Sequence, residues 1–380
     1  MTKKERVIAA IRRKPVDRIP TTFRANKVLS DILMRHLGFT DQRPADLAGS
    51  RKPFLDKLKA DFWSSGTKVD RFSTFSPKYL GPSPQPPYVD DGTSFYKIGI
   101  RAKRGKMEGY GVEYPLVGVD PPLAGALSPS DIPKGFLMER LELFDFGVMK
   151  NAYREVKAEE IEHSGDDIVS VGSLSNFFMI CCYLRGMEAF LMDMAFDRKM
   201  TERLAGEVGE FILEFNRREL DALGRKAVYY GTWDDVCGQN GMLFSPELFK
   251  KLFLPTYKEL IGNVHAHGLF YGWHCCGSVH EVLPLMIDAG IDVFDVVQTS
   301  ARDMEIENVH RLYGGDVCLH GAVDVQKDLV EKSAEGVKEV VKKIKDLWGN
   351  RGGMILAPSH ETLPDAPVEN ILAVYEAAGE

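Results

Sequence analysis

The sequence predicts an α/β fold, a (β/α)₈ TIM barrel in which eight parallel strands alternate with helices. From Ile168 onward, short apolar runs suited to buried parallel strands follow one another, and helical patterns separate most of them. These six runs are Ile168–Val171, Ala227–Tyr230, Leu269–Trp273, Ile291–Val297, Val317–Leu319 and Met354–Ala357. Two earlier segments, Ile19–Phe23 and Asp61–Trp63, bring the count to eight. An open doubly wound sheet is the alternative, but the nucleotide motifs G-x-G-x-x-G after the first strand and G-x-x-x-x-G-K-[ST] are both missing.

The chain begins with a predicted helix. Thr2 and Glu5 have the spacing of a capping box, and Pro15 stops the helix. Its apolar face consists of Val7, Ile8 and Ile11.

An irregular stretch rich in Pro and Gly, at about residues 61–134, predicts an insertion over one end of the barrel. Within it, Asp91-Gly92 between Tyr88-Val89 and Ser94-Phe95-Tyr96 predicts a β-hairpin. Its aromatic residues favour an ordered insertion over a disordered linker, and they are also consistent with a homodimer. We therefore expect residues 1–380 to form a single barrel domain that carries this insertion.

Helix signals punctuate the C-terminal half. Ser245 is an N-cap with Pro246 after it, Gly268 closes that helix, and Pro255 predicts a kink inside it. Ser278 is expected to cap the next helix, which Gly290 ends.

Composition narrows the classes of function. The net charge of −7 argues against nucleic-acid binding, which needs a basic face. No apolar stretch approaches the roughly 20 residues that span a bilayer, and the N-terminus lacks the apolar core of a signal peptide. Six cysteines are too sparse for a disulfide framework in a chain of this length. We therefore expect a cytoplasmic protein with reduced thiols.

Polar residues follow the predicted strands, where a barrel enzyme carries its active site. They are Arg24 and Asn26; Ser173, Ser175 and Asn176; Asp234 and Asp235; His274 and Cys276; Gln298; His320 and Asp324; and Ser359 and His360. Some of them are expected to be helix caps. The strand-end histidines and Cys276 point to chemistry, because the whole chain has only nine histidines.

The sharpest group is His274 and Cys276. Side chains alternate on an extended segment, so these two point the same way. An imidazole and a thiolate so placed suit zinc, and a catalytic zinc takes three protein ligands. His360 or His320 is the candidate third ligand. The alternative is a packed cysteine beside a hydrogen-bonded histidine.

Asp234-Asp235 follows Gly231-Thr232-Trp233. One of the two carboxylates is expected to cap a helix and the other to face the site, as a base or a substrate anchor. The sequence leaves open which one does which.

Several motifs resemble the uroporphyrinogen decarboxylase superfamily. They are Glu5-Arg6-Val7 and Pro15–Pro20 in the opening segment Thr2–Pro20, Ser245-Pro246-Glu247 with Pro255-x-Tyr257-Lys258, His265-x-His267-Gly268, and the closing His360-Glu361-Thr362-Leu363-Pro364 with Pro367, Glu369, Asn370 and Ile371. The resemblance independently implies the (β/α)₈ barrel. The superfamily contains porphyrinogen decarboxylases and cobalamin-dependent methyltransferases. The decarboxylases have Arg-Gln-Ala-Gly-Arg-Tyr after the first strand, and here only Arg24 is an equivalent.

The methyltransferase branch has a zinc site made from H-x-C at the fifth strand and a Cys after the eighth. By this resemblance His274 and Cys276 are metal ligands, and His360 takes the place of the second Cys. The resemblance implies a zinc-dependent enzyme that moves a methyl group between a small methylated ether, thiol or amine and the cobalt of a partner corrinoid protein. The chain has no Asp-x-His-x-x-Gly motif, so the cobalamin would come from that partner.

In this interpretation zinc acts as a Lewis acid and Asp234, His274 and His360 are catalytic. Substrate binding is expected from Arg24, Asp235, Gln298 and His320. Two alternatives remain. One is a metal-free decarboxylase of a carboxylated substrate that uses Arg24, Asp234 and His360. The other is a non-catalytic corrinoid or tetrapyrrole carrier.

Overall fold

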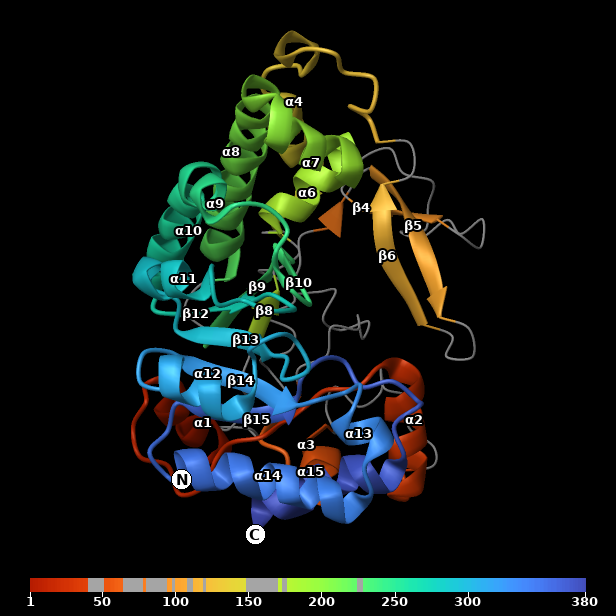
Figure 1. Ribbon diagram of the computed structural model, residues 1–380, viewed down its shortest axis with the longest axis vertical. Coiled ribbons are helices and arrows are strands. Elements are labelled where there is room, and N and C mark those ends of the chain that lie inside the picture. The colour runs from red at the N-terminus through yellow and green to blue at the C-terminus, as the bar shows by residue number, and fades with distance from the viewer. Residues whose placement is uncertain are drawn as a thin grey trace.

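The computed structural model describes residues 1–39, 51–63, 78–79, 94–97, 100–107, 112–118, 121–147, 170–172, 176–223 and 228–380. Its centre is a parallel barrel (Figure 1). The barrel strands are β1 (Thr22–Phe23), β2 (Phe62–Trp63), β8 (Ser170–Gly172), β9 (Tyr229–Trp233), β12 (Phe270–His274), β13 (Val293–Val297), β14 (Cys318–Val323) and β15 (Met354–Pro358).

The strands are neighbours in the order β2-β1-β15-β14-β13-β12-β9-β8. Six of them form one sheet, β1 pairs with β2, and a parallel bridge from Thr21 to Leu356 joins β1 to β15. Each lies where an apolar run predicted a strand, and bounds differ by a few residues. The predicted (β/α)₈ barrel is confirmed. The carboxyl ends of β1, β9, β12, β13, β14 and β15 therefore converge on one mouth.

Helices surround the strands. They are α1 (Lys3–Ile11), α2 (Lys27–His36), α3 (Arg51–Leu58), α4 (Phe136–Leu141), α6 (Phe177–Arg185), α7 (Met187–Phe196), α8 (Arg198–Leu223), α9 (Pro246–Leu252), α10 (Leu254–Ala266), α11 (Leu283–Ala289), α12 (Ile306–Tyr313), α13 (Asp328–Glu331), α14 (Ala334–Trp348) and α15 (Val368–Gly379), with a short 3₁₀ helix at Pro129–Asp131. No described helix is long and apolar enough to cross a membrane.

Two helix predictions need correction. The helix expected to kink at Pro255 is two helices, because the chain breaks at Phe253 and Pro255 falls in the first turn of α10, where its missing N–H costs nothing. The helix expected to begin at Ser278 begins at Leu283, since residues between them form turns. Gly290 ends it in the left-handed conformation, as predicted (φ 102°).

The base of the barrel is closed by α1. Its predicted capping box is present: Thr2 accepts from the Glu5 amide, and Glu5 accepts from the Thr2 amide. Val7, Ala10 and Ile11 pack against the barrel through Val293, Cys318 and Ile355.

A fully buried carboxylate, Asp61, ties this base together. It accepts hydrogen bonds from Arg6, from both terminal nitrogens of Arg18 (2.8 and 3.0 Å) and from the Thr21 amide (2.8 Å). Every acceptor position of Asp61 therefore serves the fold.

The predicted insertion contains an antiparallel sheet, β4 (Ser94–Lys97), β5 (Ile100–Met107) and β6 (Val112–Gly118), which stands beside α6 (Figure 1). Ser94–Tyr96 belongs to β4, which pairs with β5, whereas the predicted turn at Asp91-Gly92 lies outside the described residues. Two short strand pairs complete the strands of the described ranges: β3 (Lys78–Tyr79) with β7 (Phe144–Asp145), and β10 (Cys237–Gly238) with β11 (Gly241–Met242). The extent of the insertion as a unit stays a prediction.

Candidate metal centre

Three side chains with metal-ligand atoms meet at the barrel mouth. β12 ends at His274, and Cys276 follows two residues later; His360 comes two residues after β15. One ligand atom from each of the three lies within 4.8 Å of the others. The alternation of an extended chain places His274 and Cys276 on one side, and the curvature of the barrel brings His360 to them.

The geometry suits a tetrahedral ion. The Cys276 Sγ atom lies 3.3 Å from His274 Nε2, and the rings of His274 and His360 are inclined at 70° with centroids 5.7 Å apart. Zinc bonds of about 2.0 Å to nitrogen and 2.3 Å to sulfur, at a tetrahedral angle, would hold the two atoms about 3.5 Å apart. The donor set and spacing therefore fit zinc.

The mouth also contains a buried carboxylate that the sequence reading missed, Asp295 on β13. Its Oδ2 lies 2.6 Å from His274 Nδ1, and its Oδ1 lies 3.2 Å from His320 Nδ1. Arg24 donates to both oxygens, at 2.7 and 3.2 Å. The available signal was an acidic residue in the middle of an otherwise apolar strand, where a charge needs partners.

Burial and the charged neighbours at the mouth shift the pKa values of His274, His360 and Asp295. Burial opposes a charge on His274, but the charges of Asp295 and Cys276 outweigh it and raise the pKa of His274 to about 10. Burial, with the nearby charges of Arg24 and His274, lowers the pKa of His360 to about 3. Although burial opposes ionisation of Asp295, the surrounding positive charges hold its pKa well below the usual range.

His320 and His360, the two candidates for the third ligand, differ in their partners. Besides its contact with Asp295, His320 places Nε2 at 3.1 Å from the Thr22 hydroxyl. Both of its ring nitrogens are thus engaged by the protein. His360 is the histidine that joins His274 and Cys276.

The two neighbouring aspartates diverge. Asp234 is fully buried, and it accepts hydrogen bonds from the amides of Phe178 (2.7 Å) and Met179 (3.1 Å) and from the Tyr257 hydroxyl (2.6 Å). Asp234 therefore caps α6; burial raises its pKa to about 7, against the lowering effect of those bonds. Asp235 is only partly buried and accepts from the Cys276 amide at 3.0 Å. The carboxylate of Asp234 thus makes the helix-capping contacts, and the catalytic role expected for this residue stays a prediction.

Gln298 and Gly277 shape the loop after β12. The Gln298 side-chain oxygen accepts from the Gly277 amide at 2.8 Å. Gly277 has φ 92°, and a Cβ there would lie 2.3 Å from the Gly238 carbonyl oxygen, so the position requires glycine. Gln298 thus supports the loop that carries Cys276.

Other strand-end polar residues serve the backbone. Asn26 accepts from the Leu29 amide as an N-cap, and Asp324 accepts from the amides of Gln326 and Lys327. Ser173 and Ser175 lie outside the described residues. Glu361 belongs to the closing motif His360–Pro364, and its carboxyl is largely buried. This burial raises the pKa of Glu361, and the nearby charge of Arg24 offsets only part of the rise.

A family model described as uroporphyrinogen decarboxylase (URO-D) matches residues 109–380, more than half of the chain. The chain belongs to the uroporphyrinogen decarboxylase family. The matched part includes all three members of the His274, Cys276 and His360 cluster, whereas the motifs in Thr2–Pro20 precede it. No curated protein sequence matches the chain.

Among solved structures, a methyltransferase from Methanosarcina mazei aligns over 100% of this family member and 98% of its own chain, with a TM-score of 0.64 and 17% sequence identity. At that identity the likeness shows the shared fold. A B12-independent methionine synthase from Shewanella sp. W3-18-1, in complex with selenomethionine, aligns over 61% of this chain and 65% of its own, with a TM-score of 0.40 and 13% identity. The second likeness is too low to argue from.

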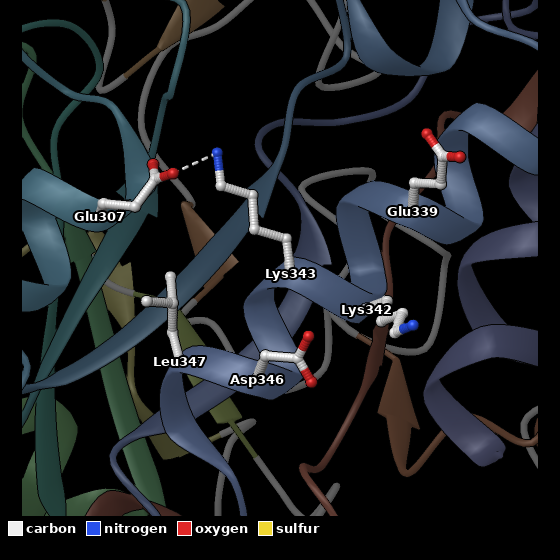
Figure 2. Close-up of a pocket in the computed structure, with 6 residues that line it drawn as sticks. All are labelled: Glu307, Glu339, Lys342, Lys343, Asp346 and Leu347. Atoms are coloured by element: carbon white, nitrogen blue, oxygen red, sulfur yellow. Dashed lines mark ion pairs between the residues drawn. The ribbon is translucent and has the colours of Figure 1, made fainter.

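A separate hollow of about 340 Å³ lies between α12 and α14 (Figure 2). It is lined by Glu307, Glu339, Lys342, Lys343, Asp346 and Leu347. Lys343 pairs with Glu307 across it, and about half of each side chain is exposed. Because opposite charges already neutralise each other in this open hollow, we assign the chemistry to the barrel mouth.

Proposed function

We propose that this protein is a zinc-dependent methyltransferase that moves a methyl group between a small methylated compound, an ether, thiol or amine, and the cobalt of a partner corrinoid protein. The observation that carries the proposal is the meeting of His274, Cys276 and His360 at the barrel mouth. A histidine and cysteine donor set is characteristic of zinc, and three protein ligands leave a position open.

His274, Cys276 and His360 would hold the ion. When bound, zinc supplies Lewis acidity toward the sulfur, oxygen or nitrogen of the substrate. The residues of the chain do the rest. His360 offers an uncharged ring, since its pKa is lowered to about 3, and can bind without first losing a proton.

The loop after β12 would keep Cys276 in place. Asp235 accepts from the Cys276 amide, and Gln298 accepts from the amide of the next residue, Gly277. Asp235, which is partly exposed, remains the carboxylate that we propose as a substrate anchor. For Arg24, Gln298 and His320, the contacts described above favour support of the site over direct substrate binding.

Family membership and the fold shared with a methyltransferase support this proposal. The decarboxylase alternative would use Arg24 and Asp234 as free charged groups. In the structure Arg24 is paired with Asp295 through both terminal nitrogens, and Asp234 caps α6. Neither group is available in the way that this alternative needs, so we favour methyl transfer.

The test combines metal content with turnover. Wild-type protein purified without a His-tag or added metal should contain about one zinc per chain by elemental analysis, and Cys276→Ser should contain almost none. The wild type should methylate cob(I)alamin, followed by its change in visible absorbance, with at least one methylated ether, thiol or amine, and Cys276→Ser should not. Metal-free wild-type protein that also refuses added zinc would contradict the proposal, as would full turnover by Cys276→Ser.

A further inference from the structure

Asp295 has contacts that no sequence motif indicated. Four nitrogens surround its carboxylate: Nδ1 of His274 and Nη2 of Arg24 at Oδ2, and Nδ1 of His320 and Nη1 of Arg24 at Oδ1. Arg24 follows β1, at a sequence separation of 271 residues. The side chains of Arg24, His274 and Asp295 are each about nine-tenths buried, so solvent cannot replace these partners.

The chemistry of the four partners fixes where the proton of His274 lies. An ionised carboxylate only accepts hydrogen bonds, and a guanidinium only donates them. Among the described residues, His274 Nδ1 has two hydrogen-bonding neighbours, Asp295 at 2.6 Å and Arg24 Nη2 at 3.4 Å. Nδ1 must therefore carry a hydrogen and donate it to Asp295. The other nitrogen, Nε2, is the one that faces Cys276 Sγ at 3.3 Å.

Arg24 keeps the Asp295 carboxylate in the orientation in which it contacts His274. Its two-pronged pairing sets the plane of the Asp295 carboxylate and presents a donor to each of its oxygens. Arg24 cannot do for His274 what Asp295 does, because a guanidinium only donates and would favour the tautomer with a bare Nδ1 and the hydrogen on Nε2. The orientation of the imidazole ring thus depends on Asp295.

We propose that Asp295, clamped by Arg24, is the positioning residue of the metal centre: it fixes the Nδ1–H form and the orientation of His274, so that Nε2 joins Cys276 and His360 as a ligand. This inference rests on the zinc site of the proposed function, and it is independent of the methyl donor. A carboxylate behind a ligating histidine fixes its tautomer and raises its basicity.

The deciding variant is Asp295→Asn. An amide of the same size has one accepting oxygen, and in either orientation its NH₂ group faces a nitrogen of Arg24, together with His274 or His320. We expect zinc affinity to fall by about 10–100-fold, as for other outer partners of metal ligands. The affinity is measured by competition with a chromophoric chelator. The visible spectrum of the cobalt(II)-substituted protein, which reports ligand geometry, should shift as well.

Asp292→Asn is the matched control. Asp292 lies at the opposite, amino end of the same strand, where its carboxylate is 2.7 Å from His265 Nε2. It has the same type of partner but no link to the metal ligands. We expect its zinc affinity to stay within about twofold of wild type, because distant sites act independently.

A second measurement needs no variant. Long-range ¹H–¹⁵N spectra of zinc-loaded wild-type protein, labelled with ¹⁵N-histidine, should show His274 with its proton on Nδ1 and zinc on Nε2. Zinc on Nδ1 would overturn the inference, even if Asp295→Asn did not fold. So would a folded Asp295→Asn whose zinc affinity stays within about threefold of wild type, well short of the usual cost of losing an outer partner. Wild-type protein that refuses zinc overturns the proposed function together with this inference.

Discussion

The two ends of the barrel each contain a buried aspartate gripped by arginine, yet the two sites differ. At the base, Asp61 is bound by Arg6, Arg18 and the Thr21 amide. At the mouth, Asp295 is bound by Arg24 and by the imidazoles of His274 and His320. A guanidinium group and a backbone N–H have no electron pair to offer a metal ion, whereas each imidazole has a second nitrogen that can offer one.

That second nitrogen separates the structural network at Asp61 from the network at the proposed metal centre. At Asp61 the network ends in donors, so its whole effect is on stability. At Asp295 the network continues through His274 Nε2 to Cys276. This agrees with barrel enzymes in general, which place chemistry at the carboxyl ends of the strands and stability at the amino ends.

The largest expected effect tests the base. Asp61→Asn removes the buried counter-charge of Arg6, whose side chain is 9% exposed, and of the partly buried Arg18, and it should lower the free energy of unfolding by about 3–5 kcal/mol. Urea denaturation gives the value, and Asp17→Asn is the control. Asp17 also pairs with Arg6 but is 41% exposed, so its loss should cost less than about 1 kcal/mol. If folded Asp61→Asn lost its zinc, the separation of the two ends would be wrong.

The next effect tests the mouth. His360→Gln removes a proposed ligand and should weaken zinc binding by more than about 100-fold, beyond the cost of losing an outer partner. His320→Gln, a variant of the neighbouring strand-end histidine, should weaken it by less than that. Chelator competition on both proteins measures the ratio. An equal loss of zinc affinity in both variants would favour the alternative from the sequence, in which His320 is the third ligand.

A smaller effect is expected from Asp234→Asn. One of its amide positions would present NH₂ to a backbone donor of α6, at a cost of about 1–3 kcal/mol in unfolding free energy. Tyr257→Phe removes only one of the three donors and should cost about 1 kcal/mol. Zinc content should stay at one per chain in both. An Asp234→Asn protein with unchanged stability but no turnover would restore the catalytic role that the sequence suggested.

The smallest effect belongs to Asp292→Asn. The pair it disrupts is partly exposed, with His265 41% and Asp292 26% accessible, and such pairs contribute less than about 1 kcal/mol. Thermal unfolding should place this variant close to wild type. A loss of several degrees would show that exposure alone does not distinguish the pair of Asp292 and His265 from the buried pairs that Asp295 makes with His274 and His320.

Much of this fold could be predicted from the sequence because the strands and helices of a barrel have recognisable patterns of apolar and polar residues within each segment. The eight apolar segments became β1, β2, β8, β9, β12, β13, β14 and β15. Helix details were less secure. The break at Phe253 and the late start of α11 at Leu283 depend on packing against the barrel, which local capping signals do not report.

The sequence by itself determined the part of the site that lies within one strand end. His274 and Cys276 are two residues apart on an extended segment, so their shared direction follows from strand geometry. Their positions at strand ends made His360 and His320 both candidates for the third ligand, the family resemblance favoured His360, and the contacts of each ring were visible only in the structure.

Only the tertiary structure decided the partners that come from distant strands. In the sequence, Asp295 is one acidic residue within an apolar run. In the structure, β1 places Arg24 and β12 places His274 next to its carboxylate. Likewise, a shift of one residue decides which of Asp234 and Asp235 meets the amides of α6, and in the structure Asp234 accepts from them. The physical reason is the same in each case: a buried charge is placed where its partners are, and these lie far away in the chain.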